Sequence, residues 1–546
     1  MAVSQNGRAH TAHVNMMTDT IIANLSADGL RIIMRSLLAC HPEITASFER
    51  ETRKHVAQGA AVALDTDLSG AELQGLKEIQ QVTRCMLGSG LCFQSLPLLQ
   101  KLAIQGMKTA KSSSESVIEE VHDFLVSVDG DIVQAMTAVQ KTLFVVTGVR
   151  TMSVDERLPV KCLYEALLEC EFSGEYIYSR GLDATASTLG ITNPTIKQLQ
   201  GTSANGGFGK LPPPPEARET FQLGVTRLPR IFSGLWQMSS PAWGAAPTSK
   251  MINQFSKYVQ GGYTAFDMAD HYGDAEIIFG RFRSLYPYKE SIFAATKYCV
   301  FHPMTVSREA VRINISQRCQ RLQQDRIDLL QFHWQNWNDA QYLDALRFIS
   351  EDKRVGMIGL CNFDTEHLEK TIENKIPIYT NQVQFSLIDS RPTVKMGEIC
   401  AQHNVRLLTY GTLCGGFLAH KWMNKPEPDI YDKSTTPSQR KYHGMIRSWG
   451  GWQLFQGLLH TLNAIAAKHD VSISNVATRW VLDFPYVGAV IVGARMGISE
   501  HTEENLAAFG WSLDSEDLAD IERVLAKSKR MDMFETMGDC GREYRL

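Results

Sequence analysis

Apolar and polar residues follow two different periods along this chain. Up to about residue 200, apolar residues recur every three to four positions, as in 30–38 and 116–126, which is the period of an amphipathic helix. Ser26, Ser112 and Ser153 stand where caps would precede such helices. This part of the chain is therefore predicted to be a set of helices joined by short connections.

From residue 223 onward, short apolar runs alternate with helix-like stretches, a pattern that favours a parallel sheet covered by helices. The fold class we predict is α/β, a (β/α)8 TIM barrel preceded by an all-helical N-terminal domain. A long gap at 411–452 is interpreted as a binding loop. The eight strand-like runs are 231–237, 263–268, 292–297, 327–333, 355–360, 379–385, 405–410 and 488–493.

The length of 546 residues exceeds the roughly 250 residues of a single barrel. A glycine-rich stretch at 201–209, followed by prolines at 212–215, has the composition of a linker. We predict a helical domain of unknown role over 1–200, a Gly/Pro-rich linker over 201–222 and the barrel over 223–546. An ordered loop packed on the barrel is the other interpretation of the linker.

Composition narrows the class of function. The formal net charge is only −4 with both signs interspersed, which gives no basic stripe for nucleic acid. The 11 cysteines lack zinc-site spacing, no signal-like start is visible, and no apolar run approaches the ~20 residues that span a bilayer. We expect a cytoplasmic protein with a small-molecule substrate, no nucleic-acid partner and no membrane insertion.

Four polar side chains stand at or just after the ends of successive strand-like runs: Asp267, Tyr272, Lys297 and His333. In a barrel these ends share one mouth. Tyrosine can protonate a nascent alkoxide if a cation such as Lys297 stabilises the phenolate, because its reference pKa is near ~10. Asp267 would fix Lys297, and a neutral His333 would donate a hydrogen bond to the carbonyl. No side chain supplies a hydride, so a nicotinamide cofactor is implied.

Each of these residues alone has a purely structural interpretation, as a loop cap, a half-buried aromatic, a solvated strand end or a core histidine. Their joint occurrence at strand ends favours catalysis. Asp270, His271 and Asp274 are close enough in sequence to suggest a metal site. No second cluster of ligands accompanies them, so we interpret them as a loop lining and predict no metal.

Several motifs occur in one order: 266–276, Thr296-Lys297, 327–333, 359–363, 381–384 and 490–495, followed by Glu504-Asn505. At these residues the chain resembles the aldo-keto reductase superfamily, over roughly 223–546. Members of that superfamily are (β/α)8 barrels that use NADP(H) and an Asp-Tyr-Lys-His tetrad. The resemblance implies an NADP-dependent oxidoreductase (alcohol:NADP+ class) that reduces an aldehyde or ketone to an alcohol, or the reverse.

The resemblance also implies the cofactor residues. Cys361, Asn362 and Gln382 would hold the nicotinamide amide and Tyr410 would stack on its ring, with Cys361 departing from the usual serine. Arg495 would pair with a 2′-phosphate, which favours NADP(H) over NAD(H). The other cofactor-binding residues would be Gly411, Leu413, Gly493, Ala494, His501, Glu504 and Asn505.

Aromatic residues are expected around the substrate. Trp236, Trp243, Trp334 and Trp337 stand where relatives have pocket walls, and any of them could instead be core. We assign Trp236 and Trp334 to the substrate pocket, Trp334 because it follows His333 directly.

An alternative function is an NADP(H)-binding regulatory or scaffold subunit with little turnover. The potassium-channel β subunits of the superfamily provide the precedent. A partner would then dock through the helical N-terminal domain. A third interpretation is that these helices tether or self-associate an ordinary reductase.

Overall fold

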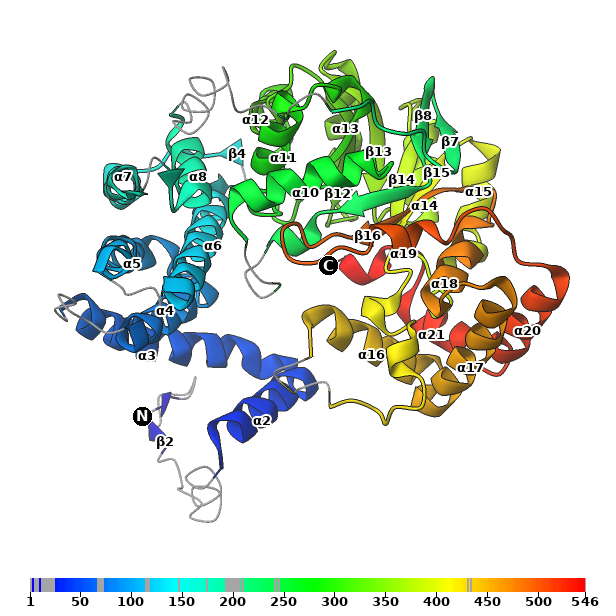
Figure 1. Ribbon diagram of the computed structural model, residues 1–546, viewed down its shortest axis with the longest axis horizontal. Coiled ribbons are helices and arrows are strands. Elements are labelled where there is room, and N and C mark those ends of the chain that lie inside the picture. Colours follow the sequence, from blue (N-terminus) through cyan, green and yellow to red (C-terminus); the bar gives the residue numbers. More distant parts are fainter. Residues whose placement is uncertain are drawn as a thin grey trace.

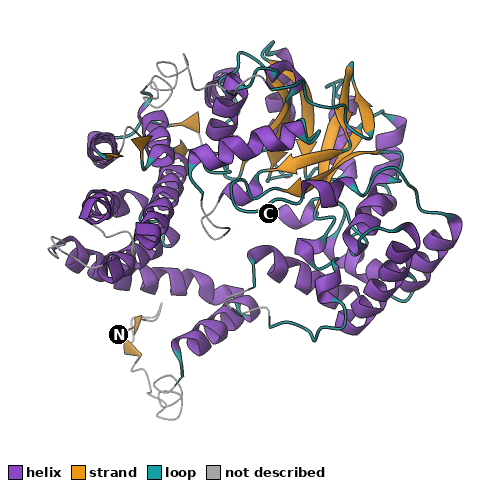
Figure 2. Ribbon diagram, in the orientation of Figure 1, coloured by secondary structure: helices purple, strands orange, loops and turns teal. Residues whose placement is uncertain are grey.

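A closed barrel of eight parallel strands forms the larger part of the computed structural model (Figure 1; Figure 2). Each strand pairs in parallel with the next, and the last closes on the first through Val490–Gly493 and Ile231–Gly234. The structure describes residues 2–3, 9–10, 25–65, 73–112, 118–145, 148–172, 175–191, 208, 211–239, 243, 246–429, 432 and 435–545.

All eight predicted runs are strands of this barrel, so the predicted fold class is confirmed for this part. The polar residues predicted to act therefore lie on one end of the barrel, where parallel strands finish. The strands are β9 (Ile231–Gly234), β10 (Ala265–Asp267), β11 (Phe293–Val300), β12 (Ile327–Trp334), β13 (Val355–Cys361), β14 (Thr380–Gln384), β15 (Arg406–Tyr410) and β16 (Val487–Gly493).

Helices surround the barrel and bury an apolar cluster between themselves and the strands. They are α10 (Thr248–Gln260), α11 (Ala275–Leu285), α12 (Arg308–Leu322), α13 (Gln341–Glu351), α14 (Thr365–Glu373), α15 (Met396–Gln402), α16 (Pro437–Trp449), α17 (Gly451–His469), α18 (Ile473–Leu482), α19 (Thr502–Leu506), α20 (Ser515–Leu525) and α21 (Arg530–Met537).

An antiparallel hairpin that the sequence did not predict closes the amino-terminal end of the barrel. Its strands are β7 (Thr220–Leu223) and β8 (Thr226–Pro229). Leu223 and Leu228 pack inside the barrel against Phe232 and Leu329. The hairpin therefore fills the end of the barrel opposite the strand ends that carry the polar residues predicted to act.

The predicted loop at 411–452 is partly helical. α16 begins at Pro437, behind a capping box between Thr436 and Gln439. Proline at the first helical position costs no hydrogen bond, because that N–H has no partner inside the helix. Pro437 therefore starts a helix inside the segment that was predicted to be a binding loop.

The helical region contains α2 (Ala27–Cys40), α3 (Thr45–Asp65), α4 (Leu73–Gly88), α5 (Cys92–Ser112), α6 (Ile118–Thr142), α7 (Val154–Glu169) and α8 (Ser179–Leu189). Its prediction as helical is confirmed, with small additions: short strand pairs of two residues each, β1 (Ala2–Val3) with β2 (Ala9–His10), β3 (Phe144–Val145) with β4 (Gly148–Val149), and β5 (Glu171–Phe172) with β6 (Glu175–Tyr176). Ser26 and Ser153 cap helices as predicted.

The helical region has its own apolar core, formed mainly by α4 to α8. The domain boundaries stay a prediction, and 201–207 of the predicted linker lies outside the described residues. Among the described residues, no helix combines the length and apolar character that crossing a membrane requires.

The helical region lies against one side of the barrel (Figure 1). The Arg180 guanidinium of α8 donates to both carboxylate oxygens of Asp274, at 2.8 and 2.9 Å. Both side chains are at least 95% buried. Ser179 also hydrogen-bonds Thr248 of α10 at 2.9 Å. A buried ion pair therefore joins the two parts of the chain beside the turn after β10.

Candidate active site at the carboxyl ends of the strands

Asp267 and Lys297 form a buried ion pair in the barrel mouth. Asp267 ends β10, and Lys297 lies on β11 next to it. The Lys297 Nζ donates to Asp267 Oδ2 at 2.6 Å and to the Met268 carbonyl at 2.9 Å. Asp267 raises the pKa of Lys297 against the lowering effect of burial. The lysine therefore stays charged in the mouth, and its role toward Tyr272 stays a prediction.

Tyr272 lies over this pair, in the turn between β10 and α11. The Lys297 Nζ lies 4.9 Å from the centre of the Tyr272 ring, and the side chain is 9% exposed. Burial raises the pKa of Tyr272 above its ordinary value, and Lys297 lowers it only in part. The phenol therefore holds its proton at neutral pH, which is the state that a proton donor needs.

His333 is buried on β12, and its protonation can be deduced from its neighbours. Its Nδ1 lies 3.0 Å from the Cys361 carbonyl, which can only accept, so Nδ1 carries the hydrogen. Burial, helped by Arg545, lowers the pKa of His333 to about 3. The neutral ring then presents Nε2 as an acceptor, whereas we predicted from the sequence that His333 donates to the carbonyl.

Two glutamines, Gln331 and Gln382, bind the Asp267 carboxylate. The sequence did not predict a contact between them and the tetrad. Gln331 lies two residues before His333 on β12 and donates to Asp267 Oδ1 at 2.8 Å. The Gln382 Nε2 donates to the same oxygen at 2.8 Å and to Gln331 Oε1 at 2.8 Å. The Asp267 carboxylate thus receives three side-chain donors. The alternation of inward residues on β12 is the one sequence signal that could have suggested Gln331.

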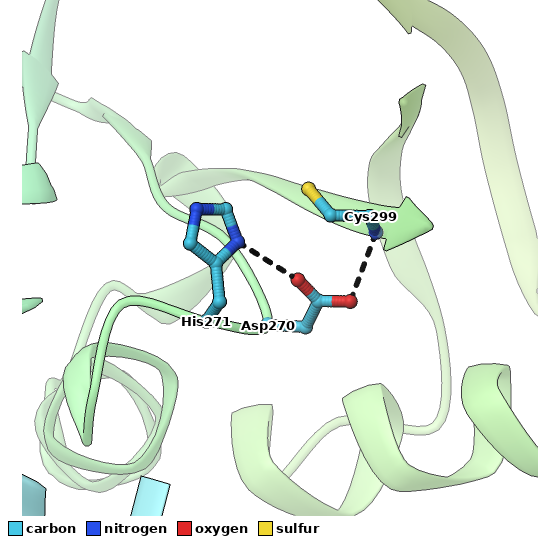
Figure 3. A group of neighbouring side chains, drawn as sticks. All are labelled: Asp270, His271 and Cys299. Atoms are coloured by element: carbon cyan, nitrogen blue, oxygen red, sulfur yellow. Dashed lines mark hydrogen bonds and ion pairs between the residues drawn. The ribbon is translucent and has the colours of Figure 1, made fainter. Parts of the chain in front are cut away.

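The acidic residues of the turn after β10 bind partners that hold the turn in place. Asp270 accepts from the backbone N–H of Cys299 at 2.9 Å and lies 3.1 Å from His271 Nδ1 (Figure 3). Their ligand atoms and the Cys299 thiol lie within 4.8 Å of one another. The bonds in Figure 3 account for the grouping, and Arg318 also pairs with Asp270 at 3.3 Å.

Glu276, one turn further, accepts from Arg321 at 2.8 Å and from the Thr296 hydroxyl at 2.5 Å. Its carboxylate also pairs with Arg318 at 3.1 Å. Together with Asp270 and Asp274, it fixes the turn that carries Tyr272. Of these three, Asp270 and Asp274 were predicted as a loop lining, and the arginine partners on α8 and α12 were not foreseen.

A cavity of about 780 Å³ lies between the helical region and this turn. Leu143, Met152 and Leu189 line it from the helical side, and His271 and Phe301 line it from the barrel. The His271 ring lies 4.8 Å from that of Tyr272, and Phe301 lies 5.3 Å from His333. The helical region therefore forms a wall of a space that adjoins the tetrad.

The residues predicted to hold a nicotinamide gather beside the tetrad. Asn362 follows β13 with a left-handed φ of 56°. Its Oδ1 accepts from the Tyr410 hydroxyl at 2.9 Å. Cys361 is buried, and burial raises the pKa of its thiol to about 11. Gln382 directs its nitrogen to Asp267, which leaves its carbonyl oxygen facing away from that bond.

The outer residues predicted to bind cofactor lie along two loops. Gly411 has a φ of 74°, and a Cβ there would lie 2.1 Å from the Tyr442 hydroxyl, so only glycine fits. Leu413 packs partly buried on the core. Gly493 ends β16, and the Ala494 N–H donates to the Gly234 carbonyl. These contacts place the loops beside the mouth.

The Arg495 guanidinium donates twice to the Trp243 carbonyl, at 3.0 and 2.7 Å. His501 Nδ1 lies 3.2 Å from Glu504 Oε2 on the surface, and the Asn505 N–H donates to the His501 carbonyl. No ion pair of Arg495 is present among the described residues. Its roles toward a phosphate, and those of its neighbours, stay predictions.

The two tryptophans assigned to the substrate pocket lie in different settings. Trp236 is 41% exposed and packs against Trp243 at 5.3 Å. Trp334 is 2% exposed, and its indole N–H donates to the Asn336 and Asp339 carbonyls. Trp334 also stacks on Phe332 in the core. Trp236 is thus partly exposed and Trp334 is packed in the core, and the pocket role of both stays a prediction.

A segment that sequence reasoning missed, residues 538–545, lies over the mouth. The Arg391 guanidinium ties it down by donating to Glu543 and to the Gly538 and Asp539 carbonyls. The Tyr544 hydroxyl lies 3.1 Å from that of Tyr410. We name residues 538–545 the mouth segment. It brings Arg545 next to His333.

Comparison with known proteins decides the family. The sequence model of the Aldo/keto reductase family matches residues 230–526. The chain belongs to the aldo/keto reductase family. It is an oxidoreductase of the aldo/keto reductase type, and the helical region lies outside the match.

Relatives of this aldo/keto reductase include "Aldo-keto reductase YhdN" of Bacillus subtilis, 25% identical over 54% of this chain and 89% of the relative. "Pyridoxal reductase, chloroplastic" of Arabidopsis thaliana is 25% identical over 58% and 89%. "Flagellar radial spoke protein 5" of Chlamydomonas reinhardtii is 32% identical over 26% and 27%. A solved glycerol dehydrogenase from Gluconobacter oxydans matches at 24% identity with a TM-score of 0.49, covering 57% of this chain and 97% of that one.

Proposed function

We propose that the protein reduces an aldehyde or ketone to an alcohol, or catalyses the reverse, with NADP(H) and with Tyr272 as general acid and base. The buried Asp267–Lys297 pair beneath Tyr272 carries this proposal. A fixed cation beside a phenol stabilises the phenolate that remains when the proton leaves. Few structural roles require a lysine that is only 2% exposed.

Each residue of the tetrad would have its own role in the reaction. Tyr272 would give its hydroxyl proton to the oxygen of the carbonyl as that oxygen becomes an alkoxide. Lys297 would stabilise the phenolate, and Asp267 would keep the ammonium in place. His333 is neutral and would shape the position of the carbonyl.

The nicotinamide fits the donor set beside the tetrad. A carboxamide needs both a donor and an acceptor partner, and the Asn362 amide nitrogen and the Gln382 amide oxygen supply them. Among the described residues, neither atom takes part in another hydrogen bond. When bound, the cofactor would supply the hydride. Arg495 supports a preference for NADP(H) if its guanidinium leaves the Trp243 carbonyl for a phosphate.

Replacing Tyr272 by Phe tests the proposal. We expect NADPH oxidation with a panel of aldehydes and ketones to fall by about 10²–10⁴-fold, because the proton donor is lost. Cofactor binding, followed by fluorescence, should persist. Tyr298→Phe is the matched control, since Tyr298 is a buried tyrosine whose hydroxyl donates to Met304 Sδ at 3.6 Å, away from the tetrad. Near wild-type turnover by Tyr272→Phe would refute the assignment.

A second candidate function is a regulatory or scaffold subunit that binds NADP(H) and docks a partner through the helical region. The exposed apolar side chains of α2 favour it: Ile33, Met34 and Leu37 are each 42–43% exposed. A relative named for a flagellar radial spoke is consistent with a partner. Copurification of a stoichiometric partner with slow turnover would support this function, and efficient turnover by the isolated chain would oppose it.

A further inference from the structure

We propose that Arg545 recognises an anion on the substrate, so that the preferred substrates are carbonyl compounds with a carboxylate close to the reacting carbonyl. This inference rests on the proposed reductase function and names its substrate class. It starts from a guanidinium that the mouth segment places beside the tetrad.

Arg545 lies directly against a catalytic residue. Its Nη1 lies 3.5 Å from His333 Nε2, the nitrogen that the Cys361 carbonyl leaves as an acceptor. Its Nη2 donates to the Asn362 carbonyl. The guanidinium therefore borders both the place of the reacting carbonyl and the proposed nicotinamide residues.

The charge of Arg545 has no counter-ion among the described residues. The neighbouring carboxylates are engaged elsewhere: Asp364 binds His367 and caps α14, and Glu543 binds Arg391. Burial lowers the pKa of Arg545 only to about 10, so it remains a cation at neutral pH. A partly buried cation without a counter-ion is costly unless an anion binds it.

The guanidinium has donors to spare. An arginine carries five N–H donors, and the contacts with His333 and Asn362 use two of them. The Nε atom is buried and has no hydrogen-bond partner among the described residues. A carboxylate accepts two parallel N–H bonds from such a fork.

The arginine is held in one orientation before any ligand arrives. Its guanidinium lies 4.3 Å from the centre of the Trp337 ring, and Trp337 stacks on His367 at 3.8 Å. Gly541 lies so close to the Asn362 carbonyl that a Cβ would be 2.2 Å from it. This close approach fixes the mouth segment, and a pre-oriented fork loses less entropy on binding.

The distances limit how far the anion can be from the carbonyl. The proposed carbonyl position borders His333 Nε2, and Arg545 Nη1 lies 3.5 Å from that atom. A carboxylate directly attached to the carbonyl, or separated from it by a short chain, can therefore meet the guanidinium. Oxo acids and short semialdehyde acids have this chemistry.

The test compares acids with their neutral esters in NADPH-coupled turnover: phenylglyoxylate with its methyl ester, and succinic semialdehyde with its methyl ester. For Arg545→Met we expect kcat/KM to fall about 10- to 100-fold for at least one acid, the magnitude of a lost charge-assisted hydrogen bond. The matching ester should change less than about threefold. Arg545→Lys should restore part of the loss.

Arg542→Met is the matched control, because Arg542 is an exposed arginine on the same mouth segment. It should alter neither acid nor ester. Equal losses for acids and esters in Arg545→Met would overturn the proposal in favour of a structural role. Equal gains would overturn it too, since they would show that Arg545 obstructs the mouth.

A binding measurement separates this inference from the proposed function. Tryptophan fluorescence, with Trp337 stacked under Arg545, should change saturably with oxamate but not with neutral oxamide. The change should disappear in Arg545→Met. If it occurs although no carbonyl is reduced, the reductase proposal fails and the anion site stands. If oxamate gives no saturable change in the wild type, the anion site is refuted.

Discussion

The Asp267 carboxylate is the most heavily bonded group of the site. Lys297 binds one of its oxygens, and Gln331 and Gln382 bind the other. Three donors fix the carboxylate from different strands, and the carboxylate fixes the lysine under Tyr272. Gln331 thus acts through Asp267 and Lys297, and among the described residues it forms no hydrogen bond with Tyr272.

Replacing Gln331 by Leu should lower kcat by about tenfold, because one hydrogen bond to a charged group is worth roughly 1.5 kcal/mol or more. KM for the carbonyl should stay within about twofold, since Gln331 does not reach the substrate. Steady-state kinetics measures both. A rise in KM at constant kcat would show that Gln331 binds substrate instead. Gln331→Glu should not rescue the activity, because it places a second acid beside Asp267.

The protonation states of the site predict a flat pH profile for reduction. Tyr272 must be protonated and His333 neutral. Burial raises the pKa of Tyr272 above its ordinary value and lowers that of His333 to about 3. Both requirements therefore hold between about pH 5 and pH 9.

We expect kcat/KM for a neutral carbonyl to change less than about twofold over that range, measured at constant ionic strength. Activity would be lost below it as His333 gains a proton, and above it as Tyr272 loses one. An inflection near pH 6.5 would mean that His333 titrates like a solvated histidine, against its buried setting.

The tetrad could be predicted from sequence because its members follow apolar runs whose ends must meet in a barrel. Gln331 and Arg545 could not, since their roles depend on contacts across 64 and 212 residues. Periodicity shows which face a residue is on, and it does not show which distant residue lies opposite. The tautomer of His333 likewise depends on one carbonyl brought in by β13.

At the scale of elements, the turn after β10 is held by α12. Arg318 and Arg321, one turn apart on that helix, both pair with Glu276. All three side chains are at least 94% buried. The helix therefore fixes the turn that carries Tyr272 through nearly buried charges.

Glu276→Gln should destabilise the protein by about 3–5 kcal/mol, because it leaves buried guanidinium groups without their carboxylate. Chemical unfolding followed by circular dichroism measures the change. Glu309→Gln is the control, since Glu309 forms an exposed pair with Arg312 on the same helix and should cost less than about 1 kcal/mol. Equal stabilities of the two variants would contradict the role of Glu276.

Strand prediction succeeded because each barrel strand is a short apolar run between turn residues. The hairpin of β7 and β8 was missed because its strands have only four residues each and alternate weakly. α16 was missed because the whole of 411–452 was interpreted as one long loop, although a proline at the first position of a helix is favourable. In both cases the local residue pattern alone could not identify the element, because the pattern has to be interpreted together with the elements next to it.

At the scale of the molecule, the helical region is joined to the barrel by the buried pair of Arg180 and Asp274. Arg180 also lies near Asp129, whose carboxylate accepts from the Arg180 and Gly181 backbone N–H groups at the start of α8. The contact reaches the barrel two residues from Tyr272. The two parts of the chain therefore meet at the turn that carries the proposed proton donor.

Arg180→Met should lower the stability by about 3–5 kcal/mol, because Asp274 would remain buried without its partner. Turnover should fall as well, since Asp274 helps to fix the Tyr272 turn. Thermal unfolding and NADPH oxidation measure the two effects. Lys161→Met is the control, because Lys161 forms an exposed pair with Glu165 on α7. An unchanged melting temperature in Arg180→Met would refute the role of this pair.

The position of that ion pair has a thermodynamic consequence for anything that binds the helical region. A partner that shifts Arg180 would change the setting of the Tyr272 turn, and with it the affinity of the barrel for its ligands. Linkage is reciprocal, so ligands in the barrel would change the affinity for the partner by the same factor. Ligand occupancy of the barrel site would then change the affinity of the helical region for its partner, and a binding measurement on the helices would report it.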